Sequence, residues 1–263
     1  MNESKVVIVT GASGGLGEAI ACWMGKTGVR VVLAARNEDR LRQVARRIEQ
    51  LGGTGLVVPA DVADAGACAK VVQAALNRFE RIDALVNNAG IVAPLVKIAQ
   101  ADIDQWQAAV HVNLMGPFCL TRFALASLTE TRGRVVNVSS GAANIPLPAA
   151  SAYCASKAGL THFTRVLAEE EPDITAVSVR PGVVDTPMQD QIRRDGPAAM
   201  NPDQVAYYKD LKASNQLEPP KVPGRSIAWL ALHAPPGMSG RFVNYDDPDI
   251  AGPARSIFGA DLD

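Results

Sequence analysis

Short runs of β-branched and apolar residues alternate with segments of helical periodicity over most of the chain, and this alternation limits the fold more than any other feature. The expected strands are 6–9, 29–35, 55–59, 82–87, 134–138, 174–179 and 241–245. The expected helices are 16–26, 39–51, 65–79, 103–128, 152–169 and 222–233. Strands that are continuously apolar are buried on both faces, and strands that alternate with helices form parallel βαβ units. The sequence therefore predicts an α/β fold with a single doubly wound, Rossmann-like parallel sheet and helices on both faces.

The length of 263 residues fits one domain spanning 1–263. The segment 187–223 interrupts the alternation because it is polar and rich in proline, with scattered apolar side chains. A long irregular segment in a compact domain is often a lid or a binding segment. We expect a substrate lid here with short helices at 189–194 and 202–214, whereas 246–263 carries no clear pattern.

A glycine-rich turn follows the first strand, with Gly11, Gly15 and Gly17 at its close-approach positions. Free N–H groups at a helix N-terminus stabilise an anion, and glycine lets a pyrophosphate come close to the backbone. The turn therefore predicts a dinucleotide site that includes Ser13 and Leu16. A glycine-rich turn without a ligand remains the alternative, because this spacing is not G-x-G-x-x-G.

The residue that follows the second strand indicates which dinucleotide is bound. A carboxylate there suits a free ribose hydroxyl, whereas an arginine suits a 2′-phosphate. Arg36 and Asn37 occupy this turn, so NADP(H) is favoured over NAD(H), although Arg36 is alternatively a solvated surface residue. Asp61 and Val62, after the third strand, are expected near the adenine, with a helix cap as the alternative for Asp61.

Tyr153 and Lys157 are one helical turn apart and share a face of the helix 152–169. A lysine cation and an oxidised nicotinamide would lower the pKa of the phenol and make it a usable general acid or base. Ser140 ends the fifth strand and is placed to bind the substrate oxygen, with Ser139 as the alternative. An aromatic anchor beside a surface lysine is the competing interpretation of the Tyr-x-x-x-Lys pair.

These motifs together resemble the main branch of the short-chain dehydrogenase/reductase family, and the resemblance covers nearly the whole chain. Besides the glycine turn and the Ser-Tyr-Lys set, it includes the segment Asn87-Asn88-Ala89-Gly90, the helix residue Asn113, and the segment Pro181-Gly182-Val183-Val184-Asp185-Thr186. The resemblance implies an oxidoreductase that acts on CH–OH and C=O groups.

The resemblance also implies roles for individual residues. Asn113 would hold a water in a proton relay to Lys157, and Lys157 would bind the nicotinamide ribose. The backbone at Val184 and the hydroxyl of Thr186 would orient the carboxamide. Further cofactor contacts would come from Asn88, Ala89, Gly90, Pro181 and Gly182.

The C-terminal part resembles the benzil-reductase and sepiapterin-reductase-like members, which reduce diketones and related carbonyls with NADPH. The last strand, 241–245, lacks the Gly-Gly pair of many members, which leaves the usual four-subunit packing open. Either a homodimer or a homotetramer is expected. The substrate is expected beside Ser140, in an apolar pocket lined by Ala142, Ile145, Val183 and Met188.

Composition and sequence patterns give no support for several other classes of function. The net charge of −1 gives no support for nucleic-acid binding, and no apolar run approaches the length of a membrane span. No secretory signal is apparent, so the predicted location is cytoplasmic. The four cysteines form no Cys-x-x-Cys pair, and no metal site is expected.

We expect an NADP(H)-dependent carbonyl reductase or alcohol dehydrogenase that acts on a small apolar ketone or diketone. An NAD-dependent alcohol dehydrogenase and a non-catalytic NADP-sensing protein are the alternatives.

Overall fold

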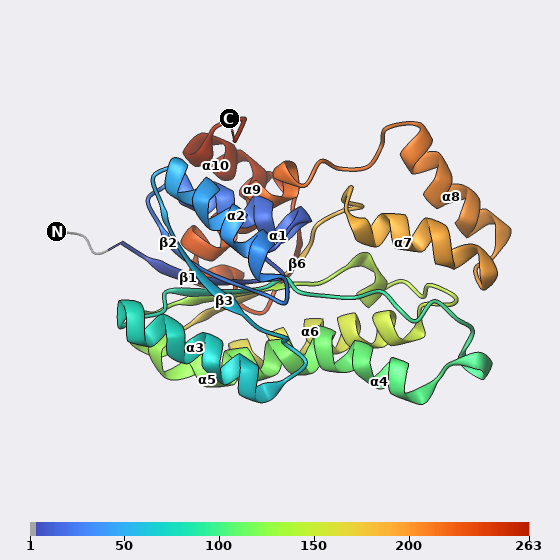
Figure 1. Cartoon of the computed structure of the whole chain (residues 1–263), viewed down its shortest axis with the longest axis horizontal. Helices are drawn as coiled ribbons and strands as arrows, with labels where there is room; N and C mark the ends of the chain where they lie inside the picture. The colour runs from blue at the N-terminus through green and yellow to red at the C-terminus, as the bar shows by residue number, and fades with distance from the viewer. Residues whose placement is uncertain (1–3, 263) are drawn as a thin grey trace.

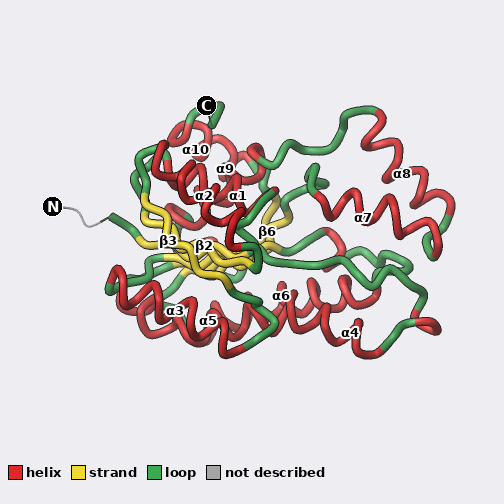
Figure 2. The backbone as a smooth tube through the Cα atoms, viewed as in Figure 1, coloured by secondary structure: helices red, strands yellow, loops and turns green. Residues whose placement is uncertain are grey.

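The computed structural model describes residues 4–262 and contains a seven-stranded parallel sheet in the order β3-β2-β1-β4-β5-β6-β7. Its strands are β1 Val6–Thr10, β2 Arg30–Ala35, β3 Thr54–Pro59, β4 Ala84–Asn87, β5 Arg134–Val138, β6 Thr175–Arg180 and β7 Phe242–Asn244. The sheet lies between two layers of helices, so the predicted doubly wound α/β fold is confirmed (Figure 2). The order reverses beside β1, where the crossovers pass to opposite sides of the sheet.

The strands form where the sequence is β-branched, because such side chains fill the space between two helical layers. All five residues of β1, Val-Val-Ile-Val-Thr, are buried. Val7 and Val9 face one hydrophobic core, and Val6 and Ile8 face the other. The alternation of side chains therefore supplies both cores from a single strand.

Two groups of helices cover the sheet (Figure 1). On one face lie α1 Gly15–Gly25, α2 Glu38–Gln50, α9 Lys221–His233 and α10 Pro248–Phe258. On the other lie α3 Ala65–Phe79, α4 Ile103–Val110, α5 Gly116–Glu130 and α6 Ser151–Glu170. Helix α10 lies in the stretch without a sequence pattern, where Gly252 and Pro253 interrupt the helical periodicity. It is held by packing, since the ring centres of Phe258 and Trp23 are 5.9 Å apart.

The prediction of a single long helix at 103–128 is wrong in one respect, because a π-helical turn divides the helix into two parts. Helix α4 runs into the π turn η2 His111–Met115, and α5 begins at Gly116 with Pro117 in its first turn. Proline suits the first turn of a helix, where its missing N–H is not needed. The extra residue in η2 changes which side chains face the sheet and leaves Asn113 fully buried.

The expected lid segment contains two helices that lie beyond the end of the sheet, α7 Pro187–Asp195 and α8 Pro202–Ala213 (Figure 1). They pack on a small apolar cluster that is separate from the two main cores and includes Val92, Leu95 and Ile192. The two predicted short helices are therefore present, and α9 begins one residue before the predicted helix 222–233.

Candidate active site

A cleft of about 510 Å³ opens at the carboxyl ends of the strands, between the sheet and the lid. It joins the glycine turn, the ends of β2, β4, β5 and β6, the start of α6 and both lid helices. A volume of this size is typical of small-molecule and cofactor sites. The predicted site residues that line it are Gly11, Ser13, Gly15, Leu16, Gly17, Arg36, Asn88, Ala89, Gly90, Ser140, Tyr153, Lys157, Pro181, Gly182, Val183, Val184, Thr186 and Met188.

The glycine turn presents bare backbone to this cleft. Gly11 and Gly15 have φ angles of 64° and 55°, which L side chains rarely adopt. A Cβ on Gly17 would lie 2.2 Å from the carbonyl oxygen of Gly11, so helix α1 approaches the turn too closely for any side chain. The N-cap of α1 is Gly14, whose lack of a side chain leaves the first N–H groups of the helix without a side-chain cap. These features fit the diphosphate of a dinucleotide.

Side chains from two strands hold the turn in this shape. The Thr10 hydroxyl accepts hydrogen bonds from the backbone N–H groups of Asn88 and Ala89, both at 3.0 Å. The Asn88 amide donates to the carbonyl oxygen of Thr10 at 2.9 Å. The segment after β4 therefore braces the turn, which accounts for the Asn-Asn-Ala-Gly sequence at this position.

Two arginines border the cleft after β2. Arg36 is the predicted residue, and Arg40 lies one turn further on, in α2. Arg40 was not predicted, although its spacing from Arg36 places both on one side of the helix start. Asn37 lies outside the cleft lining and caps α2, where its side-chain oxygen accepts from the N–H of Arg40 at 3.0 Å.

The residues predicted near the adenine are not part of the cleft lining. The Asp61 carboxylate accepts from the backbone N–H of Ala63 at 3.0 Å, which closes a local turn at the exposed end of β3. Val62 is buried and packs with the core below α3. Both remain predictions as cofactor contacts.

Tyr153 and Lys157 lie side by side at the centre of the cleft. The Lys157 ammonium nitrogen is 5.8 Å from the ring centre of Tyr153 and donates to the carbonyl oxygen of Val138 at 2.7 Å. Burial lowers the pKa of Lys157 from 10.5 to about 8. The lysine is therefore anchored to the end of β5, and its pKa lies well below that of an exposed lysine.

The pKa of Tyr153 differs from the sequence expectation. Burial raises it above its usual value of 10, and a hydrogen bond with Ser140 opposes the shift. Desolvation of the phenolate is the largest cause of the shift, and the lysine from which we expected stabilisation is not among its causes. The phenol is therefore protonated at neutral pH in the protein alone.

The geometry distinguishes Ser140 from Ser139. The Ser139 hydroxyl is buried against α6, where it pairs with the Thr161 hydroxyl at 2.7 Å and donates to the Lys157 carbonyl. Ser140 is partly exposed and hydrogen-bonds the Tyr153 side chain. The hydroxyl placed beside the phenol is therefore that of Ser140, and that of Ser139 packs the helix onto the sheet.

Asn113 lies behind the cleft and not in its lining. Its side-chain oxygen accepts from the N–H of Ile91 at 2.8 Å, and its amide donates to the carbonyl oxygen of Ile91 at 2.8 Å and to Ser156 at 3.1 Å. A Cβ on Gly90 would lie 3.2 Å from the Asn113 oxygen and 3.5 Å from the Lys157 nitrogen. The π turn therefore brings Asn113 close to Lys157, and its part in a proton relay remains a prediction.

The loop after β6 connects the cleft to the lid. Gly182 has a φ of 77°, and the Thr186 hydroxyl donates to the Val184 carbonyl oxygen at 3.3 Å. The chain that returns from the lid pairs with this loop through backbone hydrogen bonds. The Glu218 N–H donates to the Val183 carbonyl oxygen, and the Glu218 carbonyl oxygen accepts from the N–H of Asp185, both at 2.9 Å. The two ends of the lid are therefore joined beside the cleft.

The end of the cleft next to the lid helices, where the substrate is predicted, is apolar apart from Gln189. Val183 and Met188 line it as predicted, whereas Ala142 is buried outside it and the exposed side chain of Ile145 lies outside it too. Other lining residues come from the loop after β4 and from the lid, and were not predicted: Val92, Leu95, Gln189, Met200 and Tyr208. Met200 and Tyr208 belong to the apolar residues scattered through the lid, and that pattern was the available signal.

Two kinds of feature are absent from residues 4–262. No group of three or more histidine, cysteine, aspartate or glutamate side chains among them is arranged to hold a metal ion. Their helices are also too short or too polar to cross a membrane.

Comparisons with known proteins agree on one family. The family model described as short chain dehydrogenase matches residues 5–197. An uncharacterized oxidoreductase of Saccharomyces cerevisiae, YIR035C, is 36% identical over 94% of this chain and 98% of its own length. Its crystal structure superposes with a TM-score of 0.89 over 95% of this chain and 99% of that one.

Two other similar proteins have more informative names. The benzil reductase ((S)-benzoin forming) IRC24 of Saccharomyces cerevisiae is 33% identical over 95% of this chain and 99% of its own length. An alcohol dehydrogenase from the archaeon Thermococcus sibiricus, solved in complex with 5-hydroxy-NADP, is 26% identical. Its TM-score is 0.69, over 82% of this chain and 95% of that one.

Proposed function

The chain belongs to the short-chain dehydrogenase family, and we propose that it is an NADP(H)-dependent carbonyl reductase acting on a small apolar ketone or diketone. The reverse reaction would make it an alcohol dehydrogenase. The observation that carries the proposal is the continuity of one cleft from Arg36 and the glycine turn to Ser140, Tyr153 and Lys157. The complete Ser-Tyr-Lys set favours catalysis over an NADP-sensing role, which would not need it.

Each residue of the Ser-Tyr-Lys set has a role in this proposal. The nicotinamide, when bound, supplies the hydride to the carbonyl carbon. The Tyr153 phenol donates its proton to the carbonyl oxygen, and its raised pKa keeps it in the protonated form that a general acid needs. The Ser140 hydroxyl orients the same oxygen. The Lys157 ammonium stabilises the phenolate that remains, and its pKa of about 8 leaves it mostly charged at neutral pH.

Arg36 and Arg40 support the choice of NADP(H) over NAD(H). Both side chains border the cleft where β2 ends, and neither makes an ion pair with a residue among 4–262. Two guanidinium groups provide several donors for a 2′-phosphate. The NADP analogue in the similar archaeal enzyme is consistent with this preference.

Titration of the protein with NADPH and NADH tests the cofactor assignment. We expect NADPH to bind at least tenfold more tightly, because charge-assisted bonds to the phosphate contribute about 1.5–3 kcal/mol. Arg36→Ala should remove most of this preference. The matched control is Arg42→Ala, since Arg42 is paired with Glu38 on the exposed side of the same helix. Equal binding of both dinucleotides by the wild type would support the NAD-dependent alternative.

The substrate end supports an apolar carbonyl compound. Its walls come from aliphatic, methionine and tyrosine side chains together with the uncharged Gln189. Among residues 4–262, the only charged residues of the whole lining are Arg36, Arg40 and Lys157. The similarity to a benzil reductase points to the same class of substrate. NADPH oxidation should therefore be measured with apolar ketones and 1,2-diketones. No turnover on any of them, with NADPH bound, would refute the proposed activity.

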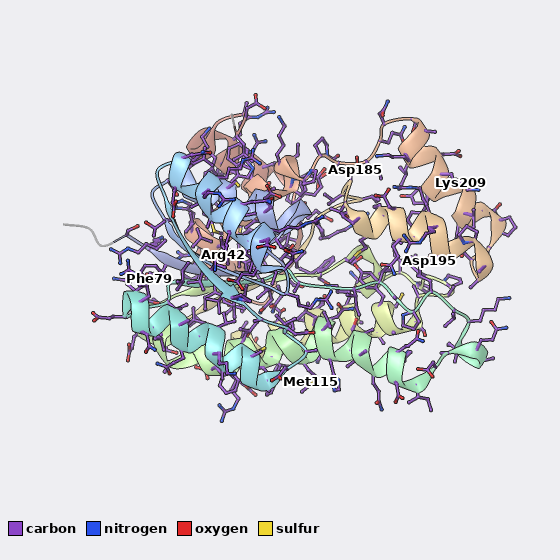
Figure 3. The ribbon with its side chains drawn as sticks, viewed as in Figure 1. Arg42, Phe79, Met115, Asp185, Asp195 and Lys209 are labelled. Carbon is purple, nitrogen blue, oxygen red and sulfur yellow. The ribbon has the colours of Figure 1, made fainter. Side chains whose placement is uncertain are left out.

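We also propose that the protein is a homodimer or homotetramer in the cytoplasm. Four large apolar side chains are exposed in the helical layer formed by η2, α5 and α6, namely Met115, Phe118, Phe123 and Val166. Figure 3 shows Met115 on the outer edge of this helical layer. Light scattering of the purified protein distinguishes a dimer or tetramer from a monomer, and a monomer at micromolar concentration would contradict the assembly.

A further inference from the structure

Two tyrosines from different parts of the chain line the same apolar region of the cleft. Tyr153 comes from α6, below the lid, and Tyr208 comes from α8, within it. Both rings pack on the cluster formed by Val92, Leu95, Ala150 and Ile192. The cleft therefore has one phenol that comes from α6, below the lid, and a second phenol that comes from α8, within the lid.

The neighbouring residue on α8 shows that this inward position is specific to Tyr208. Tyr207 is 52% exposed and does not line the cleft, whereas Tyr208 is half-buried and does. Their rings meet edge to face, with centres 5.3 Å apart. The helix thus presents one tyrosine to solvent and the other to the substrate region.

The Tyr208 hydroxyl is available as a hydrogen-bond donor. Burial raises its pKa, and the nearby Tyr153 and Tyr207 hydroxyls add to the shift, so the group is protonated at neutral pH. Within residues 4–262 this hydroxyl makes no hydrogen bond, whereas that of Tyr153 is already paired with Ser140. A polar group at an apolar wall is stabilised when a ligand supplies its partner.

We propose that Tyr208 is a specificity-determining residue whose hydroxyl donates a hydrogen bond to a second oxygen, on the carbon next to the reacting carbonyl. This inference rests on the proposed reductase function and narrows its substrate class to vicinal dicarbonyl compounds with apolar substituents. Two carbonyl groups on adjacent carbons, turned to the same side, offer two acceptor oxygens to two donors. The apolar side chains around both tyrosines accommodate the substituents.

The reaction leaves the second carbonyl unchanged. The reacting C=O gains a hydride at carbon from the reduced nicotinamide and a proton at oxygen from Tyr153, and becomes a secondary alcohol. The nicotinamide is oxidised by two electrons, and Tyr153 regains its proton from solvent. Tyr208 forms and breaks no covalent bond, and it selects which carbonyl compound is held in place.

The test compares Tyr208→Phe with Tyr207→Phe on substrates that differ by one oxygen. These are 1-phenylpropane-1,2-dione and its two mono-ketone counterparts, 1-phenylpropan-1-one and 1-phenylpropan-2-one. The wild type should prefer the dione. Tyr208→Phe should lower the ratio of kcat/KM for the dione to that for the mono-ketones about tenfold, the size expected for one lost hydrogen bond. Phenylalanine keeps the ring packed, and Tyr207→Phe should leave the ratio unchanged.

The possible failures are distinguishable. If the wild type reduces the dione and the ketones but Tyr208→Phe keeps the wild-type ratio, the inference is wrong and the reductase function stands. If the wild type has no preference for the dione, the inference is also overturned. If no dinucleotide is oxidised with any of the three compounds, the proposed function itself fails.

Discussion

The framework of strands and helices around the glycine turn and the lid formed by α7 and α8 are stabilised in different ways. The turn is braced by buried strands, by Thr10 and Asn88, and by close backbone packing at Gly17. The lid helices rest on a small apolar cluster and on the pairing of Glu218 with the loop after β6. An ion pair between Lys212 and Asp185 joins α8 to the base of the lid, where Figure 3 shows Asp185.

The framework and the lid also differ in how far the family model covers them. The short chain dehydrogenase model ends at residue 197, within the lid, and so covers the whole framework up to β6 but not α8. A rigid framework can hold a dinucleotide and the reacting groups in a fixed geometry, which hydride transfer requires. A loosely attached lid can change its lining residues with little effect on the core. We therefore expect framework substitutions to affect every substrate alike and lid substitutions to affect substrates selectively.

The largest expected effect is that of Tyr153→Phe, at the centre of the framework. Loss of the general acid should lower kcat about a thousandfold on ketones and diketones alike, without weakening NADPH binding. Steady-state kinetics and a fluorescence titration with NADPH measure the two quantities. A loss restricted to some substrates would contradict the assignment of this residue to the common framework.

Gly17→Ala should destabilise the framework by about 3 kcal/mol, because the added Cβ would lie 2.2 Å from a carbonyl oxygen. The matched control is Gly14→Ala in the same turn, since a Cβ there has no atom within 4 Å and the backbone is extended. Its free energy of unfolding should stay within about 0.5 kcal/mol of the wild type. Urea denaturation compares the two variants, and equal losses of stability would show that the turn is not closely packed.

The lowered pKa of Lys157 should make the free energy of unfolding depend on pH. Its pKa of about 8 in the folded protein is below the unfolded value of 10.5, so the unfolded state binds more protons between these values. The free energy of unfolding of the wild type, relative to Lys157→Met, should therefore rise by about 2 kcal/mol from about pH 8 to about pH 10. Urea denaturation at several pH values measures it. A constant difference would mean that burial does not shift this lysine.

The smallest effect is expected in the lid. Lys212→Ala removes an exposed ion pair of 3.0 Å, which contributes less than about 1 kcal/mol, so the melting temperature should change little. Because the pair connects α8 to the base of the lid, KM for the carbonyl substrate should rise severalfold while the Kd for NADPH stays constant. Lys209→Ala is the control, since Figure 3 shows Lys209 pointing away from the body of the molecule. A weakened affinity for NADPH would mean that lid and framework are coupled.

The same division between framework and lid explains which elements and which site residues could be predicted from the sequence. The strands and the glycine turn follow from local patterns, such as Val-Val-Ile-Val before Thr10-Gly11, and these elements form the end of the cleft that contains the glycine turn. The π turn that carries Asn113 has no local signal, and the side chain of Asn113 hydrogen-bonds Ile91, which follows β4 and is 22 residues away in the sequence. Ile145 is close to Ser140 in sequence yet outside the cleft, whereas Tyr208 is distant and inside it. Residues brought together by tertiary packing are those that local patterns identify least well.

The most direct test of the account follows the hydride itself. The protein should be supplied with NADPH carrying deuterium on one face of the nicotinamide C4 position, then with the opposite isomer, and the alcohol product of the dione examined by mass spectrometry. We expect one isomer to place deuterium on the new carbinol carbon and the other isomer to leave it unlabelled. Oxidation of NADPH without deuterium in the product from either isomer would contradict direct transfer within the cleft.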